Sequence, residues 1–225
     1  MNFTLFSNPI YSIFRRLVIA FFTPVVFSLR TGHFKSSLKK KAVDRSGDAL
    51  PWLSYPVIEF LRHRELKGKT VLEFGAGQST VWWEKQGAIV TALETNEDWK
   101  SYVEKVLPSC EVYSADHKFT NIPESVRSRR FDIILVDGGN RKTAMEEAIK
   151  LVSETGVILL DDSAVTSSRH YIASPTLMHA EGWKRIDFYG FAPGALHQGC
   201  TSLYFKSSDF FSSPKPPPEC RDRIF

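Results

Sequence analysis

A short glycine-rich segment, "VLEFGAGQST" over residues 71–80, has the composition of a loop that holds a ligand close to the backbone. An apolar run ends on Glu73, and Gly75, Ala76 and Gly77 follow before small polar residues begin. Glycine lets a backbone approach a ligand because it carries no side chain. Such a turn after a buried strand, at the carboxyl edge of a parallel sheet, predicts a cofactor site.

Acidic residues at the ends of the next two predicted strands indicate which ligand the loop holds. Glu94 ends "AIVTALE", where a carboxylate accepts hydrogen bonds from both hydroxyls of a ribose. Asp116 follows "CEVYSA", in position to accept from the exocyclic amine of an adenine. The dinucleotide fingerprint is incomplete because Thr80 stands at its third glycine position, and Glu73 suits a cationic ligand better than a pyrophosphate. An adenosine that bears an amino acid and a positive sulfur suits these carboxylates.

Three further aspartates end the two strands that follow. Asp137 ends "FDIILVD", and Asp161 and Asp162 end "GVILLDD", so the three carboxylates lie within reach of one another at one edge. In one interpretation they bind Mg²⁺, which prefers oxygen ligands and would orient a hydroxyl and lower its pKa. In the other there is no metal: Asp137 contacts the acceptor or cofactor, Asp161 caps a turn and Asp162 is solvated.

His197 lies in "FAPGALHQG", the loop after the sixth predicted strand, at the same edge of the sheet. A histidine exchanges protons near neutral pH, so His197 is a candidate general base, with an exposed loop histidine as the alternative. His170 and Tyr171 are weaker candidates of the same kind. The predicted catalytic residues are therefore Asp137 and His197.

The elements that position these residues alternate between strands and helices. The expected strands are residues 70–74, 88–94, 110–115, 131–137, 156–162, 183–191 and 200–206. The expected helices are residues 55–66, 79–87, 97–107 and 141–152. This order predicts an α/β fold with a doubly wound, mostly parallel sheet. We expect one domain over residues 51–207, preceded by a basic, apolar arm over 1–50 and followed by a Pro-rich tail over 208–225.

This set of residues resembles the class I S-adenosylmethionine-dependent methyltransferases. "VLEFGAGQST" looks like their first motif, "VTALE" like their second, and "FDIILVDGG" like the strand that carries their fourth, within a match that covers about Thr70 to Phe205. The resemblance implies a Rossmann-like, seven-stranded sheet whose last strand, near "TSLYF", is antiparallel. The cofactor-binding residues that it implies are Glu73, Gly75, Ala76, Gly77 and Ser79 around the methionine half, Glu94 at the ribose, and Ala115 and Asp116 at the adenine.

Two narrower resemblances concern the acceptor. "LPWLSYPVIEFL" and "GFAPGALHQGCTSLYF" look like segments of bacterial methyltransferases associated with surface-polysaccharide genes. The three aspartates resemble the acidic set of metal-dependent O-methyltransferases acting on catechols and macrolide sugars, with Asp162 where the catechol type usually has Asn. We predict an enzyme that O-methylates a sugar or another small hydroxylated acceptor, with Mg²⁺ as a further cofactor in the metal-dependent interpretation.

Three other functions stay open at this point. An aminopropyltransferase would need a dense acidic pocket to bind a polyamine. Only the three aspartates indicate such a pocket. An NAD-dependent oxidoreductase is disfavoured by Thr80 and Glu73. A catalytically silent cofactor-binding module, docked through the arm on a membrane or a partner, is not distinguished by the sequence.

The N-terminal arm is the basic part of a chain with net charge +4: residues 1–50 carry eight Lys/Arg against two Asp, or +6. Residues 17–29 form a 13-residue apolar run, shorter than the ~20 residues that span a bilayer, and Pro24 is expected to interrupt it. We expect either a helix packed on the domain or a peripheral membrane anchor through residues 10–41. In the second case Arg30 and Lys39–Lys41 meet anionic lipid.

Cysteine content and charge placement predict the compartment and the partners. Three cysteines without a close pair argue against a disulfide framework and a Cys-based zinc site, and fit the reducing cytoplasm. No small-x-small cleavage site follows the apolar run, which disfavours a signal peptide. We expect a cytoplasmic protein, at the inner membrane face if the arm is an anchor, with a small-molecule or glycan acceptor. No nucleic-acid partner is expected, and homodimerisation is left open.

Overall fold

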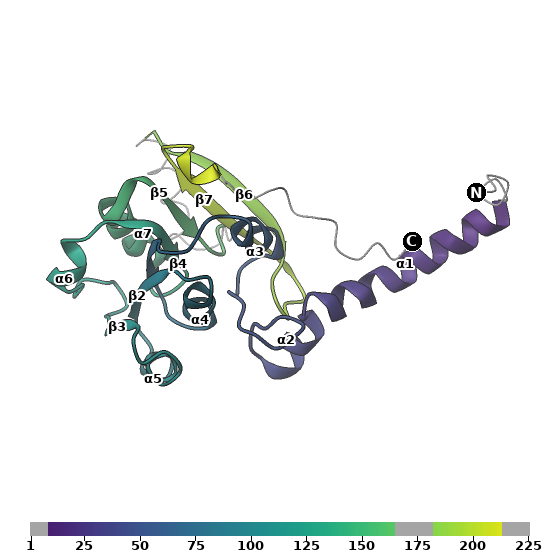
Figure 1. Cartoon of the computed structure of the whole chain (residues 1–225), viewed down its shortest axis with the longest axis horizontal. Helices are drawn as coiled ribbons and strands as arrows, with labels where there is room; N and C mark the ends of the chain where they lie inside the picture. The colour runs from purple at the N-terminus through teal and green to yellow at the C-terminus, as the bar shows by residue number, and fades with distance from the viewer. Residues whose placement is uncertain (1–8, 165–181, 213–225) are drawn as a thin grey trace.

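Seven segments rich in Val, Ile, Leu and Phe pair into one sheet. The computed structural model describes residues 9–164 and 182–212, and its strand order is β3-β2-β1-β4-β5-β7-β6 (Figure 1). The strands are β1 (Thr70–Phe74), β2 (Ile89–Glu94), β3 (Glu111–Ser114), β4 (Phe131–Val136), β5 (Val152–Leu160), β6 (Lys184–Phe191) and β7 (Gln198–Phe205). β1 to β5 pair in parallel, whereas β7 pairs antiparallel with β5 and β6. The predicted mostly parallel sheet, with its antiparallel strand near "TSLYF", is confirmed.

Of the helices in the described residues, three precede the sheet and four lie between its strands, and two of the latter begin at an asparagine cap. The helices are α1 (Pro9–Arg30), α2 (His33–Lys39), α3 (Tyr55–Arg62), α4 (Gln78–Lys85), α5 (Glu97–Val106), α6 (Glu124–Arg127) and α7 (Arg141–Leu151), with a short turn η2 (Asp209–Phe211). The Asn96 side chain accepts hydrogen bonds from two backbone N–H groups of the first turn of α5. Asn140 does the same for α7, as a helix N-cap should.

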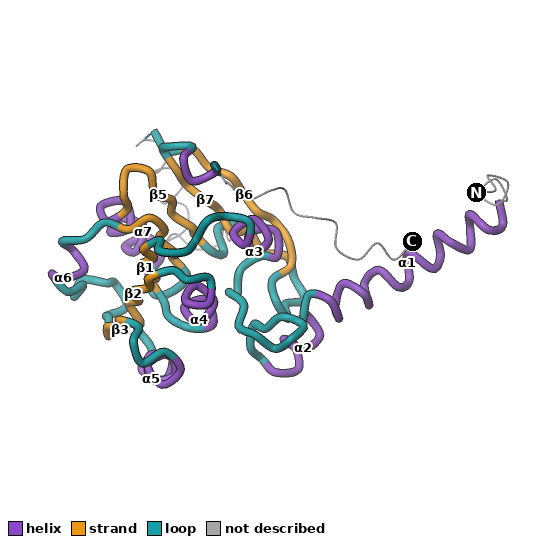
Figure 2. The backbone as a smooth tube through the Cα atoms, viewed as in Figure 1, coloured by secondary structure: helices purple, strands orange, loops and turns teal. Residues whose placement is uncertain are grey.

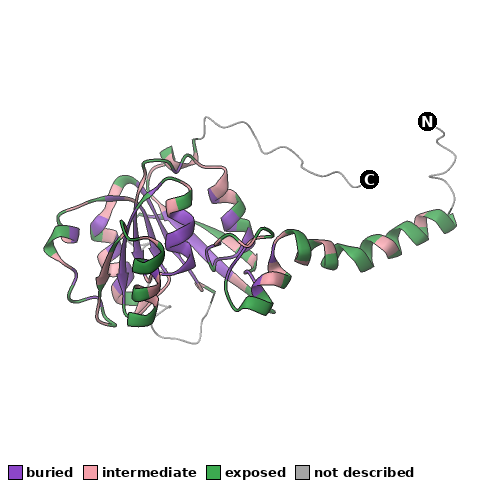
Figure 3. Cartoon of the chain, turned by 60° about the horizontal axis from the view of Figure 1, so that its bottom comes forward, coloured by how far each residue is buried: buried purple, intermediate pink, exposed green. Residues whose placement is uncertain are grey.

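Successive residues of the central strands point to opposite sides of the sheet, and helices cover both of these faces. Val71 and Ile133 belong to the core that α3 and α4 cover, whereas Leu72 and Ile134 belong to the core under α6 and α7. Figure 2 shows the strands between these helices, and Figure 3 shows that the central strands are buried, whereas the edge strands β3 and β6 contain no buried residue. The carboxyl ends of the parallel strands therefore meet at one edge, where their loops can form a site.

The N-terminal helix α1 projects away from the domain (Figures 1 and 3). None of its 22 residues is buried, and its last turn touches the domain through Phe27, whose ring centroid lies 5.5 Å from that of Tyr55. Of the two alternatives for the arm, a helix packed along the domain is therefore wrong.

The helix also runs through Pro24, so the expected interruption is wrong. Proline removes one N–H donor, and in an exposed helix water can satisfy the carbonyl that is released. By length and composition α1 is long and apolar enough to cross a membrane, although N-terminal signal sequences pass the same test.

Candidate functional site

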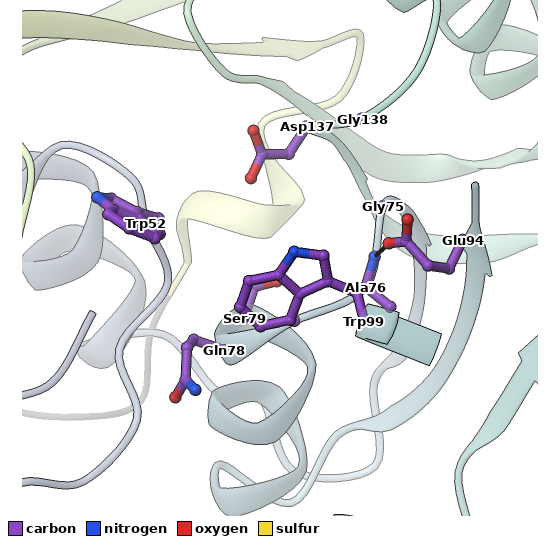
Figure 4. A pocket seen from close by; sticks show the side chains of 10 residues that line it. Trp52, Gly75, Ala76, Gln78, Ser79, Glu94, Trp99, Asp137 and Gly138 are labelled. Carbon is purple, nitrogen blue, oxygen red and sulfur yellow. Dashed lines mark hydrogen bonds between the residues drawn. The ribbon is translucent and has the colours of Figure 1, made fainter. Parts of the chain in front are cut away.

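Two adjoining cavities open at the carboxyl edge of the sheet, and the loop after β1 forms part of the wall of the first. This first cavity, of ≈ 280 Å³, is lined by Trp52, Gly75, Ala76, Gly77, Gln78, Ser79, Glu94, Trp99, Asp137 and Gly138 (Figure 4). Five predicted cofactor-binding residues thus line one cavity: Gly75, Ala76, Gly77, Ser79 and Glu94. The β1 and β2 strand ends bring them together because these two strands pair in parallel.

The two loop glycines are needed for different reasons. Gly75 has φ 111°, in the region that favours glycine, and a Cβ there would lie 3.2 Å from the backbone nitrogen of Gly138. Gly77 is extended, at φ 171°, and a Cβ there would lie 3.7 Å from the ring of Trp99, at ordinary contact distance. Gly75 therefore keeps the loop conformation, whereas Gly77 keeps space open beside Trp99.

Glu94 ties the end of β2 to the glycine loop. One carboxylate oxygen accepts a hydrogen bond from the Ala76 N–H, the dashed line in Figure 4, and the other accepts from the Asn96 N–H at 2.7 Å. The side chain is 6% exposed and faces the cavity that it lines. A carboxylate oxygen can accept more than one hydrogen bond, so Glu94 retains capacity for ligand hydroxyls.

Glu73 lies beneath the loop and not on the cavity wall, which corrects the predicted contact with a cationic ligand. Its side chain is fully buried. Thr80 Oγ1 donates to Glu73 Oε2 at 2.5 Å and accepts from the Gly77 N–H at 3.0 Å. Glu73 thus holds the loop from below through Thr80. Burial raises the pKa of Glu73 from 4.5 to about 7.

This raised pKa predicts a pH-dependent cost in stability. Between about pH 4.5 and about pH 7 the folded state keeps a proton on Glu73 that the unfolded state has lost, so stability falls as pH rises through this range. The loss is about 3 kcal/mol, complete above the folded pKa. Glu73→Gln stays neutral and keeps an oxygen that accepts from Thr80. We therefore expect its melting temperature, relative to the unmodified protein, to rise from about pH 5 to about pH 8.

The matched control is Glu111→Gln on β3. The Arg129 guanidinium, which donates to Glu111, lowers the pKa of that carboxyl, so its ionisation favours the folded state. The melting temperature of this variant relative to the unmodified protein should not rise over the same pH range. If the difference in melting temperature between Glu73→Gln and the unmodified protein does not change with pH, then Glu73 is ionised at a low free-energy cost in the folded protein.

The predicted adenine contacts Ala115 and Asp116 do not line the cavity. The Asp116 carboxylate accepts from the Lys118 N–H, from the N–H and hydroxyl of Thr120, and from the Asn121 N–H. These hydrogen bonds, led by that from the Thr120 hydroxyl, lower the pKa of Asp116. The side chain therefore holds its own loop together, and its predicted contact with an adenine amine stays a prediction.

The second cavity, of ≈ 620 Å³, shares Trp52 and Asp137 with the first. It is lined by Trp52, Ser54, Asp137, Asp161, Asp162, Ala192, Gly194, Ala195, Leu196, His197 and Gly199. The three predicted aspartates and His197 therefore do lie around one space. His197 is exposed on the β6–β7 loop, and Asp137 stands at the boundary between the two cavities.

Charges in the second cavity act on one another strongly. Burial, followed by the charge of Asp161, raises the pKa of Asp137 well above its ordinary value. Burial and the charge of Asp162 raise the pKa of Asp161 to about 7, and Asp161 accepts from the Thr201 hydroxyl at 2.7 Å. The guanidinium of Arg141 lies 3.3 Å from carboxylate oxygens of both Asp137 and Asp162.

The predicted Mg²⁺ site does not fit this arrangement. Arg141 puts its fixed positive charge between Asp137 and Asp162, where a metal shared by these carboxylates would need to lie. Among residues 9–164 and 182–212, no three Asp, Glu, His or Cys side chains form a group suited to hold a metal ion. Asp161 accepts from the Thr201 hydroxyl, and Asp162 is half exposed and pairs with Arg141.

Sequence reasoning missed the aromatic walls of the site. Trp99 lies in the first turn of α5, five residues after Glu94, and Trp52 comes from the segment between the arm and α3 (Figure 4). An aromatic residue soon after the acidic end of β2 was a usable signal for Trp99. Nothing local pointed to Trp52. The candidates His170 and Tyr171, and most of the Pro-rich tail, lie outside the described residues.

Comparisons with solved structures identify the fold. A Staphylococcus aureus protein assigned as a caffeoyl-CoA O-methyltransferase is 15% identical, with 87% of this chain and 100% of that chain covered and a TM-score of 0.56. An O-methyltransferase from Bacillus cereus, in complex with S-adenosylhomocysteine, is 17% identical, with 78% and 91% covered and a TM-score of 0.53. Precorrin-6y C5,15-methyltransferase from Geobacter metallireducens is 14% identical, with 76% and 95% covered and a TM-score of 0.51.

These likenesses show that the chain has the Rossmann-like fold found in S-adenosylmethionine-dependent methyltransferases. No protein-family model and no curated protein sequence matches the chain. The activities named for the three structures differ, so the fold alone assigns no acceptor.

Proposed function

We propose that this protein is an S-adenosylmethionine-dependent methyltransferase that methylates a hydroxyl group of a sugar or another small acceptor. The observation that carries the proposal is the pair of adjoining cavities with Asp137 and Trp52 at their boundary. Methyl transfer is an in-line displacement, so the donor methyl and the acceptor oxygen must meet from opposite sides of such a boundary.

The first cavity suits the cofactor. The Glu94 carboxylate would accept hydrogen bonds from the ribose hydroxyls, and the indole of Trp99 offers a flat apolar face to the adenine. The loop from Gly75 to Gly77 leaves room for the methionine half. S-adenosylhomocysteine is present in one solved structure of the same fold, which supports this assignment. When bound, the cofactor supplies a methyl group on a positively charged sulfur, which leaves as a neutral thioether.

The second cavity suits the acceptor. Asp137 would accept the proton of the acceptor hydroxyl as the oxygen forms its bond to the methyl carbon. A carboxylate with a raised pKa is a stronger base than an ordinary one, which favours this role. Arg141 keeps Asp137 in place through their 3.3 Å contact and offsets part of its charge. His197 is the alternative base on the same cavity.

Calorimetric titration of the purified protein with S-adenosylhomocysteine, with NAD in a parallel titration, tests the cofactor assignment. We expect binding of S-adenosylhomocysteine in the micromolar range and none of NAD. Transfer of tritium from methyl-labelled S-adenosylmethionine to a panel of hydroxylated acceptors then tests the reaction. Binding of NAD alone would support an oxidoreductase, and transfer only from the decarboxylated cofactor to a polyamine would support an aminopropyltransferase. Absence of S-adenosylhomocysteine binding to folded protein would overturn the proposal.

The two loop glycines make a matched pair of variants. Gly75→Ala forces a side chain into a left-handed conformation next to Gly138, so we expect a loss of stability of about 1–3 kcal/mol. Gly77→Ala adds a methyl group at ordinary contact distance from Trp99, so we expect near-normal stability but weaker S-adenosylhomocysteine binding, by about tenfold. Thermal melting and calorimetry separate the two effects. Unchanged binding by Gly77→Ala would place the cofactor elsewhere.

A further inference from the structure

The exposed apolar surface around α1 and α2 adjoins the mouth of the second cavity. We propose that the face formed by α1, α2 and the loop 192–197 binds an anionic membrane surface, and that the second cavity opens onto that surface. The acceptor is then a hydroxylated headgroup carried by a membrane lipid. This last step rests on the proposed methyltransferase function, whereas the membrane contact does not.

The polar residues of α1 lie along one narrow line of the helix, to which Ile19 and Val26 also lie close, and apolar residues fill the rest of its surface. Polar residues recur at spacings of four, seven and seven, which places them on one line along the helix: Ser12, Arg16, Thr23 and Arg30. Large apolar residues recur at spacings of three and four on the opposite side: Ile10, Phe14, Leu17, Phe21 and Val25. All five are exposed, Phe21 by 76%. A broad apolar face with a narrow basic stripe is the pattern of a helix that lies in a membrane interface.

The spacing of the arginines favours lying in the interface over crossing the membrane. The uncharged run between Arg16 and Arg30 is 13 residues, about 20 Å of helix, whereas the hydrocarbon core is about 30 Å thick. A crossing helix would bring Arg15 and Arg16 into hydrocarbon, which is costly. In the interface both side chains reach water and lipid phosphates while the apolar face is buried.

The segment after α1 continues the same surface. Phe34 and Leu38, four residues apart on α2, are exposed, Leu38 by 71%. Lys39 and Lys40 follow directly and are exposed as well, and the ammonium group of the exposed Lys41 lies 4.8 Å from the ring centroid of Tyr102. Each basic residue near an anionic surface strengthens binding by about fivefold, so apolar insertion and charge act together at this end of the arm.

Direct contacts join α2 to the loop that borders the second cavity. The Gly194 N–H donates to His33 Nδ1 at 3.2 Å, and the Gly194 carbonyl lies 3.5 Å from the Ser37 hydroxyl, which also donates to the His33 carbonyl at 3.0 Å. Gly194 has φ 74°, and a Cβ there would lie 2.9 Å from the Ser37 nitrogen, so the two segments pack backbone against backbone. His33 also packs against Phe191, at the end of β6.

The same loop presents an apolar side chain beside the cavity. Leu196 lines the cavity and is 95% exposed, next to His197. A membrane surface in contact with α2 would therefore also meet Leu196. An acceptor headgroup could enter the cavity toward Asp137 while its apolar tail stays in the lipid, so the cost of exposing that tail to water is avoided.

Fluorescence quenching by lipid tests this geometry on the full chain. Leu196→Cys is labelled with an environment-sensitive fluorophore in a background in which Cys110 and Cys220 are Ser; Cys200 is buried. The probe is a vesicle of phosphatidylcholine and phosphatidylglycerol that contains nitroxide-labelled lipid. We expect strong quenching at position 196. The matched label at Ile89→Cys, exposed at the amino edge of the sheet, should be quenched little.

Vesicle flotation tests the helix itself. Phe21→Glu places a charge on the apolar face of α1 and should weaken vesicle binding at least tenfold, whereas Thr23→Glu adds the same charge to the polar stripe and should have a much smaller effect. No vesicle binding, equal effects of the two variants, or binding without quenching at 196 would overturn the proposal. Light scattering that shows a dimer dissociated by Phe21→Glu would assign the apolar face to a second copy instead. S-adenosylhomocysteine binding, measured in parallel, reports on the proposed function separately.

Discussion

Replacing Asp137 by asparagine is expected to lower kcat roughly 10²- to 10⁴-fold, the range found when a general base is removed. Asp137 lines both cavities and is the acidic group at their boundary, where the proposed function has it take the acceptor proton. Asparagine has nearly the same shape but cannot accept a proton at neutral pH. S-adenosylhomocysteine binding should change little, because the glycine loop and Glu94 are untouched.

The stability of this variant gives a second, independent readout. Asp137 is repelled by Asp161 and Asp162, so loss of its charge should leave the melting temperature unchanged or raise it.

Asp162→Asn is the matched control: Asp162 also contacts Arg141, but it is half exposed and lines only the second cavity. Single-turnover transfer from labelled cofactor to the acceptor found in the screen measures the step. Near-normal turnover by Asp137→Asn would move the role of base to His197.

Replacing Glu94 by alanine is expected to weaken S-adenosylhomocysteine binding about 100-fold or more. Hydrogen bonds to a charged acceptor are worth about 1.5–3 kcal/mol each, and a ribose offers two hydroxyl donors to this carboxylate. The substitution also releases the Ala76 N–H, so the glycine loop loses a tether on the cavity side. Both effects weaken the binding of the cofactor.

The control for Glu94 is Glu111→Ala on the neighbouring strand β3. Glu111 pairs with Arg129 and lies outside the first cavity, so its loss should leave cofactor affinity unchanged. Calorimetry on the two variants, with melting curves to show that both are folded, tests whether Glu94 binds the ribose. Similar affinities for Glu94→Ala and the unmodified protein would contradict the assignment of the ribose site.

The position of Arg141 separates this site from the metal-dependent sites that the three aspartates resemble. A guanidinium bonded to Asp137 and Asp162 supplies a permanent positive charge without a metal. It comes from the first residue of α7, directly after the Asn140 cap, so the same short loop carries Asp137 and its counter-charge. The second cavity is therefore acidic but partly neutralised.

Much of the site follows from local sequence. The alternation of apolar runs with amphipathic segments predicts parallel strands joined by helices, and parallel strands necessarily bring the ends of β1, β2, β4 and β5 to one edge. The glycines at 75 and 77 and the acid at 94 were found this way, because strand ends and turn glycines are encoded within a few residues. The grouping of Asp137, Asp161 and Asp162 around one cavity has the same origin.

Only the tertiary structure decided where individual side chains point and which distant segments complete the walls. Glu73 and Asp116 stand at strand ends as expected. The Glu73 side chain lies under the glycine loop and accepts from Thr80, whereas the Asp116 carboxylate accepts from N–H groups of its own turn. Trp52 joins the site from the segment before α3 because that segment packs across the sheet edge. Side-chain direction and long-range packing depend on the whole three-dimensional arrangement. A single strand or turn of sequence does not encode them.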